Sequence, residues 1–134
     1  MEPMQARTIS VSIRCDARRV YDFVAKPEHL PDWAKGLCLS VKKNGDWTAE
    51  TLSGRVRIRF TERNDFGVLD HYVTLSTGAT LHVPMRVVPN GSGSEVLLTI
   101  FRQKGMTEQQ YAEDIRLVEQ DLRNLKRIME SDQR

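Results

Sequence analysis

The stretch TEQQYAEDIRLVEQDLRNLKRIM, residues 107–129, decides the fold. Its apolar residues recur at steps of four and three, which is the spacing of one face of an α-helix. This apolar stripe consists of Tyr111, Ile115, Val118, Leu122, Leu125 and Met129. Thr107 and Gln110 have the spacing of a capping box, so we expect the helix to begin directly after Thr107. A stripe of about five turns needs a large apolar partner surface.

The preceding segment, residues 37–103, predicts that surface, because turn signals recur in it at strand spacing. The signals are NGD at 44–46, SG at 53–54, ND at 64–65, TG at 77–78 and NGSGS at 90–94. They divide the segment into six strands joined mostly by hairpins. The stretch GRVRIRFTER, residues 54–63, alternates arginine with apolar residues, which predicts one solvated face and one packed face. Pro84 cannot donate a ladder hydrogen bond, which favours a sheet edge or a bulge there.

The N-terminal part of the chain predicts one more strand and two short helices. The stretch ARTISVSIR, residues 6–14, alternates as a first strand does. Asp16 is a candidate N-cap for the helical pattern that follows it, and Pro27 and Pro31 divide that pattern into two helices. We therefore expect a single α+β domain over residues 1–134, with the order strand, two short helices, six strands and a long helix.

Composition limits the class of protein. The chain of 134 residues is 40% hydrophobic and 28% charged, which is typical of a globular domain. A net charge of +2 is too small to predict nucleic-acid binding. No run approaches the roughly 20 apolar residues of a membrane span, and we expect a cytoplasmic protein. Cys15 and Cys38 lack metal-ligand spacing and are expected to be reduced structural thiols.

This order of elements closely resembles the START-like superfamily, also called SRPBCC or Bet v 1-like, and especially its small bacterial polyketide cyclase/dehydrase-like members. The resemblance covers about Arg7 to Met129 and includes the stretches VYDFVAKPEHLPDWAKG, FGVLDHYV and HVPMRVVPNGSGSEVL. It implies a helix-grip fold, in which a curved seven-stranded antiparallel sheet wraps around the C-terminal helix and encloses an apolar cavity. It implies no particular reaction, because members variously carry lipids, bind hormones, cyclise polyketides or assist chaperones.

The geometry of such a fold independently predicts a cavity. A curved sheet and a straight helix separate at one end, and both apolar faces line the gap. We therefore expect binding of a small hydrophobic molecule, such as a lipid, polyketide or aromatic compound. The expected lining residues are Trp33, Leu69, His71, Val73, Leu81, Val83, Met85, Tyr111, Ile115, Val118 and Leu122. For Trp33 and Tyr111, packing in the core is the alternative.

The stretch GVLDHYVTL, residues 67–75, determines which polar side chain reaches the cavity. The alternate residues from Leu69 to Leu75 form the more apolar face, so His71 is expected to point inward and Asp70 outward. A buried imidazole is favoured in its neutral form and needs hydrogen-bond partners. His71 is then either a satisfied core histidine or a ligand contact. If a bulge reverses the faces, Asp70 and Tyr72 line the cavity instead.

An enzymatic function stays open beside ligand binding. The chain could be a cyclase, aromatase or dehydrase in which His71 is the general acid or base, assisted by Tyr111 or Arg86 if they reach the cavity. We expect no metal and no cofactor, because the sequence contains no HExxH or CxxC ligand set. The glycine-rich NGSGS stands between strands, whereas a phosphate loop precedes a helix.

A protein-interaction module, including a homodimer, is the remaining alternative. Its surface would be the outer sheet face, where Arg55, Arg57 and Arg59 form a basic ridge, with Arg63 beyond it. A nucleic-acid surface would need exposed aromatic residues between these charges, and we expect none on that face.

Overall fold

The described residues form eight strands, three α-helices and one short 3-10 helix. The computed structural model describes residues 2–36, 38–52 and 54–131. The elements are β1 (Ala6–Ile13), α1 (Ala17–Val24), the 3-10 helix η1 (Pro27–His29), α2 (Leu30–Trp33), β2 (Ser40–Asn44), β3 (Asp46–Thr51), β4 (Gly54–Phe60), β5 (His71–Thr74), β6 (Thr80–Val83), β7 (Met85–Asn90), β8 (Gly93–Phe101) and α3 (Glu108–Ser131).

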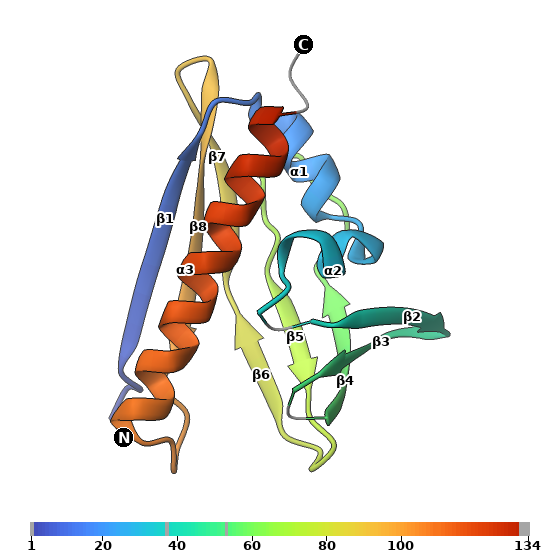
Figure 1. The fold of residues 1–134 in the computed structure, drawn as a ribbon, viewed down its shortest axis with the longest axis vertical. Helices are drawn as coiled ribbons and strands as arrows, with labels where there is room; N and C mark the ends of the chain where they lie inside the picture. Colours follow the sequence, from blue (N-terminus) through green and yellow to red (C-terminus); the bar gives the residue numbers. More distant parts are fainter. Residues whose placement is uncertain (1, 37, 53, 132–134) are drawn as a thin grey trace.

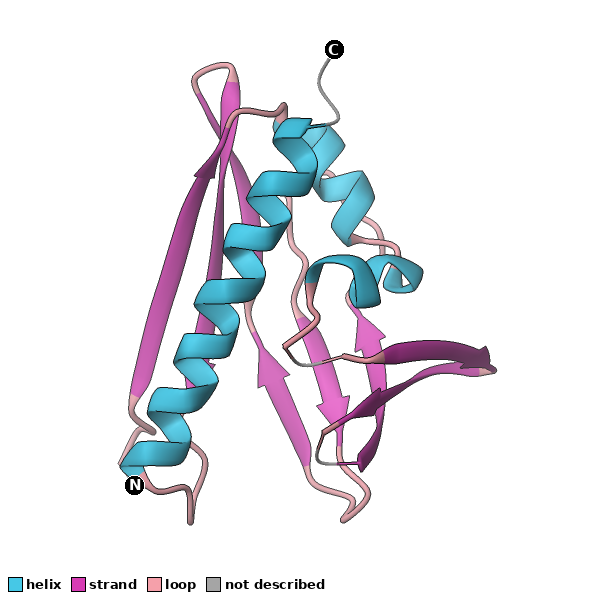
Figure 2. Cartoon of the chain, viewed as in Figure 1, coloured by secondary structure: helices cyan, strands magenta, loops and turns pink. Residues whose placement is uncertain are grey.

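The strands form two antiparallel sheets, with the orders β1-β8-β7 and β2-β3-β4-β5-β6. The long helix α3 runs along the first sheet and packs against β1 and β8, while the second sheet diverges from the helix (Figure 1). Helix α1 packs on β7 and β8, and α2 packs on α3 and β2. In the view of Figure 2 the helices lie in front of the sheets. In the described part of the chain, no helix has the length and apolar character needed to span a membrane.

The single seven-stranded sheet that we expected is wrong in one respect, because eight strands form two sheets. Residues 79–88, which were predicted as one strand, contribute to both β6 and β7, and Pro84 separates the two. Strand β6 pairs with β5, whereas β7 pairs with β8. Because proline has no N–H, position 84 cannot donate to the Thr99 carbonyl of β8, on the side of the strand away from β5. The carbonyl of Pro84 still accepts a hydrogen bond from Thr99 N–H at 3.0 Å.

A short backbone pairing joins the two sheets across this interruption. Val68 and Arg86 form an isolated antiparallel bridge, and Val87 N–H donates to Gly67 O at 3.0 Å. Gly67 has a φ of +71°, and a methyl group there would overlap the carbonyl oxygen of Val87. The glycine therefore permits both the backbone conformation and the close approach to β7.

The predicted helical features are confirmed. All six residues of the α3 stripe are buried. Thr107 and Gln110 form the capping box, with Thr107 N–H donating to the Gln110 side chain at 2.9 Å and Gln110 N–H to the Thr107 hydroxyl at 3.0 Å. Asp16 caps α1 by accepting from Arg18 N–H at 3.1 Å. These local signals succeed because each depends on residues within one turn of the helix.

Candidate functional site

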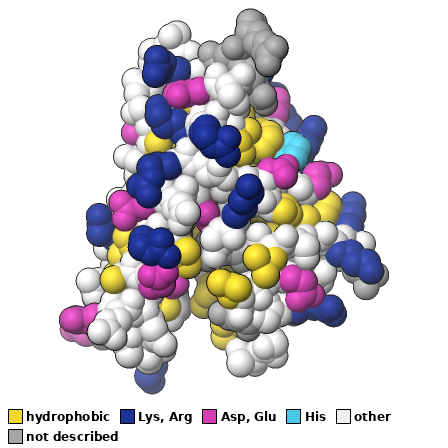
Figure 3. Space-filling model, viewed as in Figure 1, with side chains coloured by type: hydrophobic (Ala, Val, Ile, Leu, Met, Phe, Trp, Pro, Cys, Tyr) yellow, Lys and Arg dark blue, Asp and Glu magenta, His cyan; other side chains and the backbone are white. Residues whose placement is uncertain are grey.

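The candidate site is the apolar surface that α3 leaves partly uncovered on the second sheet. The principal contacts of α3 are with β1, β8 and α2. Figure 3 shows that the molecule is hollowed at its lower edge, where hydrophobic side chains lie on both sides of the hollow. We use the term groove for the half-buried side chains on this part of the sheet, which are Phe60, His71, Val73, Leu75, Leu81 and Val83.

Strand register places these side chains in rows. His71 of β5 lies opposite Phe60 of β4 and Val83 of β6, and Val73 lies opposite Leu81. Residues directly opposite one another in an antiparallel sheet share a face. Phe60, Val73, Leu75 and Val83 pack against the core cluster, which identifies this face as the inner one.

His71 is held in one orientation within the groove. Its Nδ1 atom lies 3.0 Å from the carbonyl oxygen of Leu69, and its ring lies 4.8 Å from the ring of Phe60. A carbonyl oxygen only accepts hydrogen bonds, so Nδ1 carries the proton and Nε2 presents a lone pair. Desolvation by burial holds the pKa of His71 below its usual range, which keeps the imidazole neutral at pH 7.

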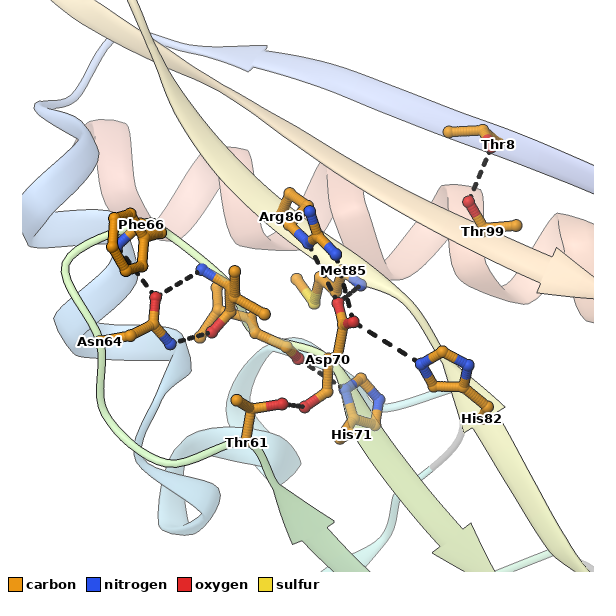
Figure 4. Close-up of polar contacts among 12 residues, drawn as sticks. Thr8, Thr61, Asn64, Phe66, Asp70, His71, His82, Met85, Arg86 and Thr99 are labelled. Atoms are coloured by element: carbon orange, nitrogen blue, oxygen red, sulfur yellow. Dashed lines mark hydrogen bonds and ion pairs between the residues drawn. The ribbon is translucent and has the colours of Figure 1, made fainter.

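Asp70 lies on the opposite face of the strand, where it binds backbone and side-chain donors (Figure 4). Its Oδ1 accepts from Met85 N–H at 2.8 Å and from Arg86 Nε at 3.3 Å, and its Oδ2 lies 3.6 Å from His82 Nε2. Burial tends to raise the pKa of Asp70, but hydrogen bonds from Arg86 and Met85 and the charge of Arg86 outweigh it. The pKa of Asp70 is consequently below its usual value.

Asp70 and His71 together replace one missing backbone hydrogen bond between Met85 and Leu69. Leu69 N–H donates to Met85 O at 2.8 Å, which marks these two residues as a hydrogen-bonded pair. In an unbroken ladder, Met85 N–H would donate back to Leu69 O. Here Met85 N–H donates to the Asp70 carboxylate, and Leu69 O accepts from His71 Nδ1. The break in the sheet therefore fixes the imidazole that faces the groove.

Comparison with solved structures identifies the fold. XoxI of Bacillus cereus has a TM-score of 0.75 and 17% identity, covering 94% of this chain and 96% of that one. Ara h 8.0201, a Bet v 1 allergen, has a TM-score of 0.69 and 11% identity, covering 96% and 99%. A START superfamily protein of Mycobacterium smegmatis has a TM-score of 0.67 and 11% identity, covering 94% and 97%.

This chain has the START/Bet v 1 fold. No protein-family model and no curated protein matches the sequence. The expected resemblance is therefore confirmed at the level of structure, where element order and topology persist at 8–17% sequence identity.

The predicted lining residues fall into two groups that differ in burial. His71, Val73, Leu81 and Val83 are half-buried in the groove. The others are buried. Trp33, Leu69, Met85, Val118 and Leu122 belong to the core cluster, whereas Tyr111 and Ile115 line a separate hollow of about 290 Å³ between the starts of β1 and α3. The Tyr111 hydroxyl donates to Ile100 O of β8 at 2.8 Å, and Arg86 binds Asp70 on the outer face. Tyr111 and Arg86, which we considered as catalytic partners of His71, are therefore both engaged elsewhere in this structure.

Three residues were absent from the predicted site, although the sequence placed one of them, Leu75, on the inner face. Phe60 and Leu75 belong to the groove, and the ring of Phe60 packs at a tilt against His71 because of a cross-strand register that the sequence does not state. Asp121 of α3 is 4% exposed, and its Oδ1 accepts from Gly36 N–H at 2.9 Å. Asp121 stands three residues after Val118 in the sequence, so its position on the buried stripe was a usable signal.

Asp121 is incompletely satisfied in this environment. Its Oδ2 is buried without a hydrogen-bond partner among the described residues. Burial raises the pKa of Asp121 to about 6, although the hydrogen bond from Gly36 acts in the opposite direction. Burial likewise raises the pKa of the nearby Cys38 thiol to about 11. Both free cysteines are buried, as expected of structural thiols.

The outer face of the second sheet differs from expectation, because an aromatic residue does lie on it. Tyr72 stands opposite Arg59, whose guanidinium lies 5.5 Å from the centre of the ring. His82 stacks on the same ring at 4.9 Å. Arg55 pairs with Glu50 at 2.7 Å. The ring of Tyr72 and the arginines Arg55 and Arg59 therefore make contacts within the sheet itself.

Two other hollows lie outside the groove. One of about 970 Å³ is beside the C-terminal part of α3, where Arg19, Ser94 and Lys126 contribute to its lining. Another of about 290 Å³ lies between the starts of β1 and α3, beside Arg7 and Arg102. Neither includes a groove residue, and both carry charged side chains. The groove is the better candidate for an apolar ligand, because apolar side chains dominate its wall.

Proposed function

We propose that the protein binds a small hydrophobic molecule in the groove. The observation that carries this proposal is the incomplete burial of an inner sheet face. Val73, Leu81 and Val83 point to the core side of the sheet, yet each remains half-buried. A ligand that removed this apolar surface from water would gain about 25 cal/mol of binding free energy for each Å² buried. A contiguous apolar surface that stays partly exposed to solvent in the folded protein is characteristic of ligand-binding grooves.

The side chains that line the groove indicate the class of ligand. Aliphatic side chains and the ring of Phe60 favour a lipid, a polyketide or an aromatic compound, and a single polar group, His71, interrupts them. The likeness to a START superfamily protein and to a Bet v 1 allergen supports the proposal at the level of fold.

A charge placed in the groove tests the proposal. The neutral fluorescent probe N-phenyl-1-naphthylamine should bind the wild-type protein saturably with increased emission. The Leu81→Arg variant should weaken this binding at least about tenfold, because it replaces apolar wall with a hydrated cation. Val88→Arg is the matched control, since Val88 is 39% exposed on β7 of the first sheet and is not a groove residue, and should bind as the wild type does.

The proposal fails if the wild-type protein shows no saturable binding of the probe. It fails equally if Leu81→Arg and Val88→Arg bind the probe with the same affinity as the wild type.

A second candidate function is an enzyme of the cyclase, aromatase or dehydrase type. One observation favours it, because the fixed tautomer of His71 leaves a basic Nε2 lone pair in an apolar wall. In this candidate, Nε2 would accept a proton from a bound substrate. His71→Gln should then reduce turnover of an aromatic polyketide substrate at least about 100-fold while substrate binding persists. Unchanged turnover in that variant would exclude this candidate.

A further inference from the structure

We infer that the groove selects hydrophobic molecules that carry a hydrogen-bond donor, such as a phenol or an alcohol, and that His71 recognises the donor. This inference rests on the binding function proposed above and adds a class of ligand to it.

Backbone hydrogen bonding determines that His71 Nε2 is an acceptor. The carbonyl oxygen of Leu69 would bind Met85 N–H in an unbroken ladder, but that N–H donates to Asp70 at 2.8 Å. The carbonyl therefore accepts from His71 Nδ1 at 3.0 Å, which commits the proton of a neutral imidazole to Nδ1. Nε2 is left as a pure acceptor, so its complement on a ligand is an O–H or N–H group.

The Nε2 atom is free and accessible. The buried side-chain nitrogen and oxygen atoms that lack a partner in the described part of the chain are Trp33 Nε1, Ser94 Oγ and Asp121 Oδ2. His71 Nε2 is not among them, although no described residue makes a hydrogen bond to it, so this atom keeps some surface that solvent can reach. Its cross-strand neighbours are Phe60 and Val83, so an apolar ligand that excluded solvent from Nε2 would leave the atom unpaired unless the ligand supplied a donor.

The surrounding charges oppose the alternative of an anionic ligand. Asp70 is the adjacent residue and carries a negative charge, and its partners Arg86 and His82 lie with it on the opposite face of the strand. Desolvation keeps the imidazole neutral, so a ligand carboxylate would meet a lone pair and find no cation on this wall. A neutral donor matches the site, whereas a methyl ether or a carboxylate leaves Nε2 unpaired.

A matched set of ligands tests this inference. Calorimetric titration at pH 7.5 compares 2-naphthol with 2-methoxynaphthalene, which keeps the ring system and the oxygen but lacks the donor, and with 2-naphthoate. The wild-type protein should bind 2-naphthol about 3- to 10-fold more tightly than 2-methoxynaphthalene, the value of one neutral hydrogen bond. Binding of 2-naphthoate should be weaker than that of either.

The matched variants are His71→Phe and His82→Phe. The first should bind 2-naphthol and 2-methoxynaphthalene with nearly equal affinity, because it keeps an aromatic ring without the acceptor. The second alters a histidine on the opposite sheet face and should retain the preference of the wild type. Long-range nitrogen-15 NMR of the wild-type protein gives an independent readout, in which the His71 Nε2 signal should shift with 2-naphthol and move little with 2-methoxynaphthalene.

The outcomes separate this inference from the proposed function. Equal affinities in the wild type, or a preference that survives His71→Phe, would overturn the donor selectivity and leave groove binding intact. If His71→Phe does not fold, an Nε2 signal unaffected by 2-naphthol overturns the inference. If the wild type binds none of these compounds and also fails to bind N-phenyl-1-naphthylamine, both the inference and the proposed function fall.

Discussion

Asp70 and His71 are neighbours in the sequence with opposite surroundings, because successive residues of a strand face opposite sides. Asp70 satisfies the N–H of Met85, and His71 satisfies the carbonyl of Leu69. Each side chain thereby replaces one end of the same missing backbone bond. The local sequence placed these two residues on opposite faces, but it could not reveal the interrupted pair, which lies across the sheet.

Asp121 has a different effect at the residue scale, since its burial opposes folding at neutral pH. Its pKa is raised from 3.8 to about 6, so between these pH values the folded protein binds more protons than the unfolded chain. The free energy of unfolding therefore falls as pH rises through this window, and the penalty is fully present above it. The shift corresponds to a penalty on the order of 3 kcal/mol.

Asp121→Asn should accordingly stabilise the protein at neutral pH. The amide keeps an acceptor for Gly36 N–H and removes the buried charge. Urea unfolding at pH 7.5 should show a gain of about 1–3 kcal/mol, with a smaller effect at pH 4.5. Asp65→Asn is the control, because the Asp65 side chain is 86% exposed, and it should change stability little. A loss of stability in Asp121→Asn at pH 7.5 would contradict this account.

At the scale of elements, the strands on either side of Pro84 depend on close backbone packing at Gly67. The residues that precede β5 pair with β7 and join the two sheets. The positive φ of Gly67 and its contact with the Val87 carbonyl both require the absence of a side chain. The helices depend less on such long-range contacts, because caps and apolar spacing specify their ends and faces locally.

Two glycine variants separate conformation from packing. Gly67 and Gly78 both have positive φ, but a methyl group at Gly78 would meet nothing within 4 Å. Gly78→Ala should lower the free energy of unfolding by about 1 kcal/mol, the cost of the left-handed conformation. Gly67→Ala should lower it by at least about 3 kcal/mol, because β7 must also move. Similar losses in the two variants, measured by chemical denaturation, would show that the close approach to β7 is unimportant.

At the scale of the whole molecule, the helices cover the two sheets unequally. Helices α1 and α3 pack on the first sheet, where Val87, Val96 and Leu98 are buried. The inner residues of β5 and β6 are only half-buried. Uneven burial implies uneven local stability, and segments that bind ligands commonly belong to the less stable part.

Native-state hydrogen exchange should report this difference. Backbone amides of β5 and β6 should exchange through openings of lower free energy than those of β8, because fewer buried apolar contacts hold them. Saturating N-phenyl-1-naphthylamine should slow exchange in β5 and β6 by more than it slows exchange in β8. Uniform protection in all three strands, with and without the probe, would contradict the unequal coverage.

The sequence by itself determined the helices of this protein, the order of its elements apart from the division of one strand at Pro84, and the apolar face of each. The stripe of α3, the cap at Thr107 and the alternation around His71 all follow from interactions between residues close in the chain. Tertiary structure alone decided that Pro84 divides the sheet and that Val73 and Leu81 stay half-buried while Leu122 is fully buried. Local periodicity fixes which face of an element is apolar. How much of that face another element covers depends on the separation and angle between segments distant in sequence, which no short stretch of residues encodes.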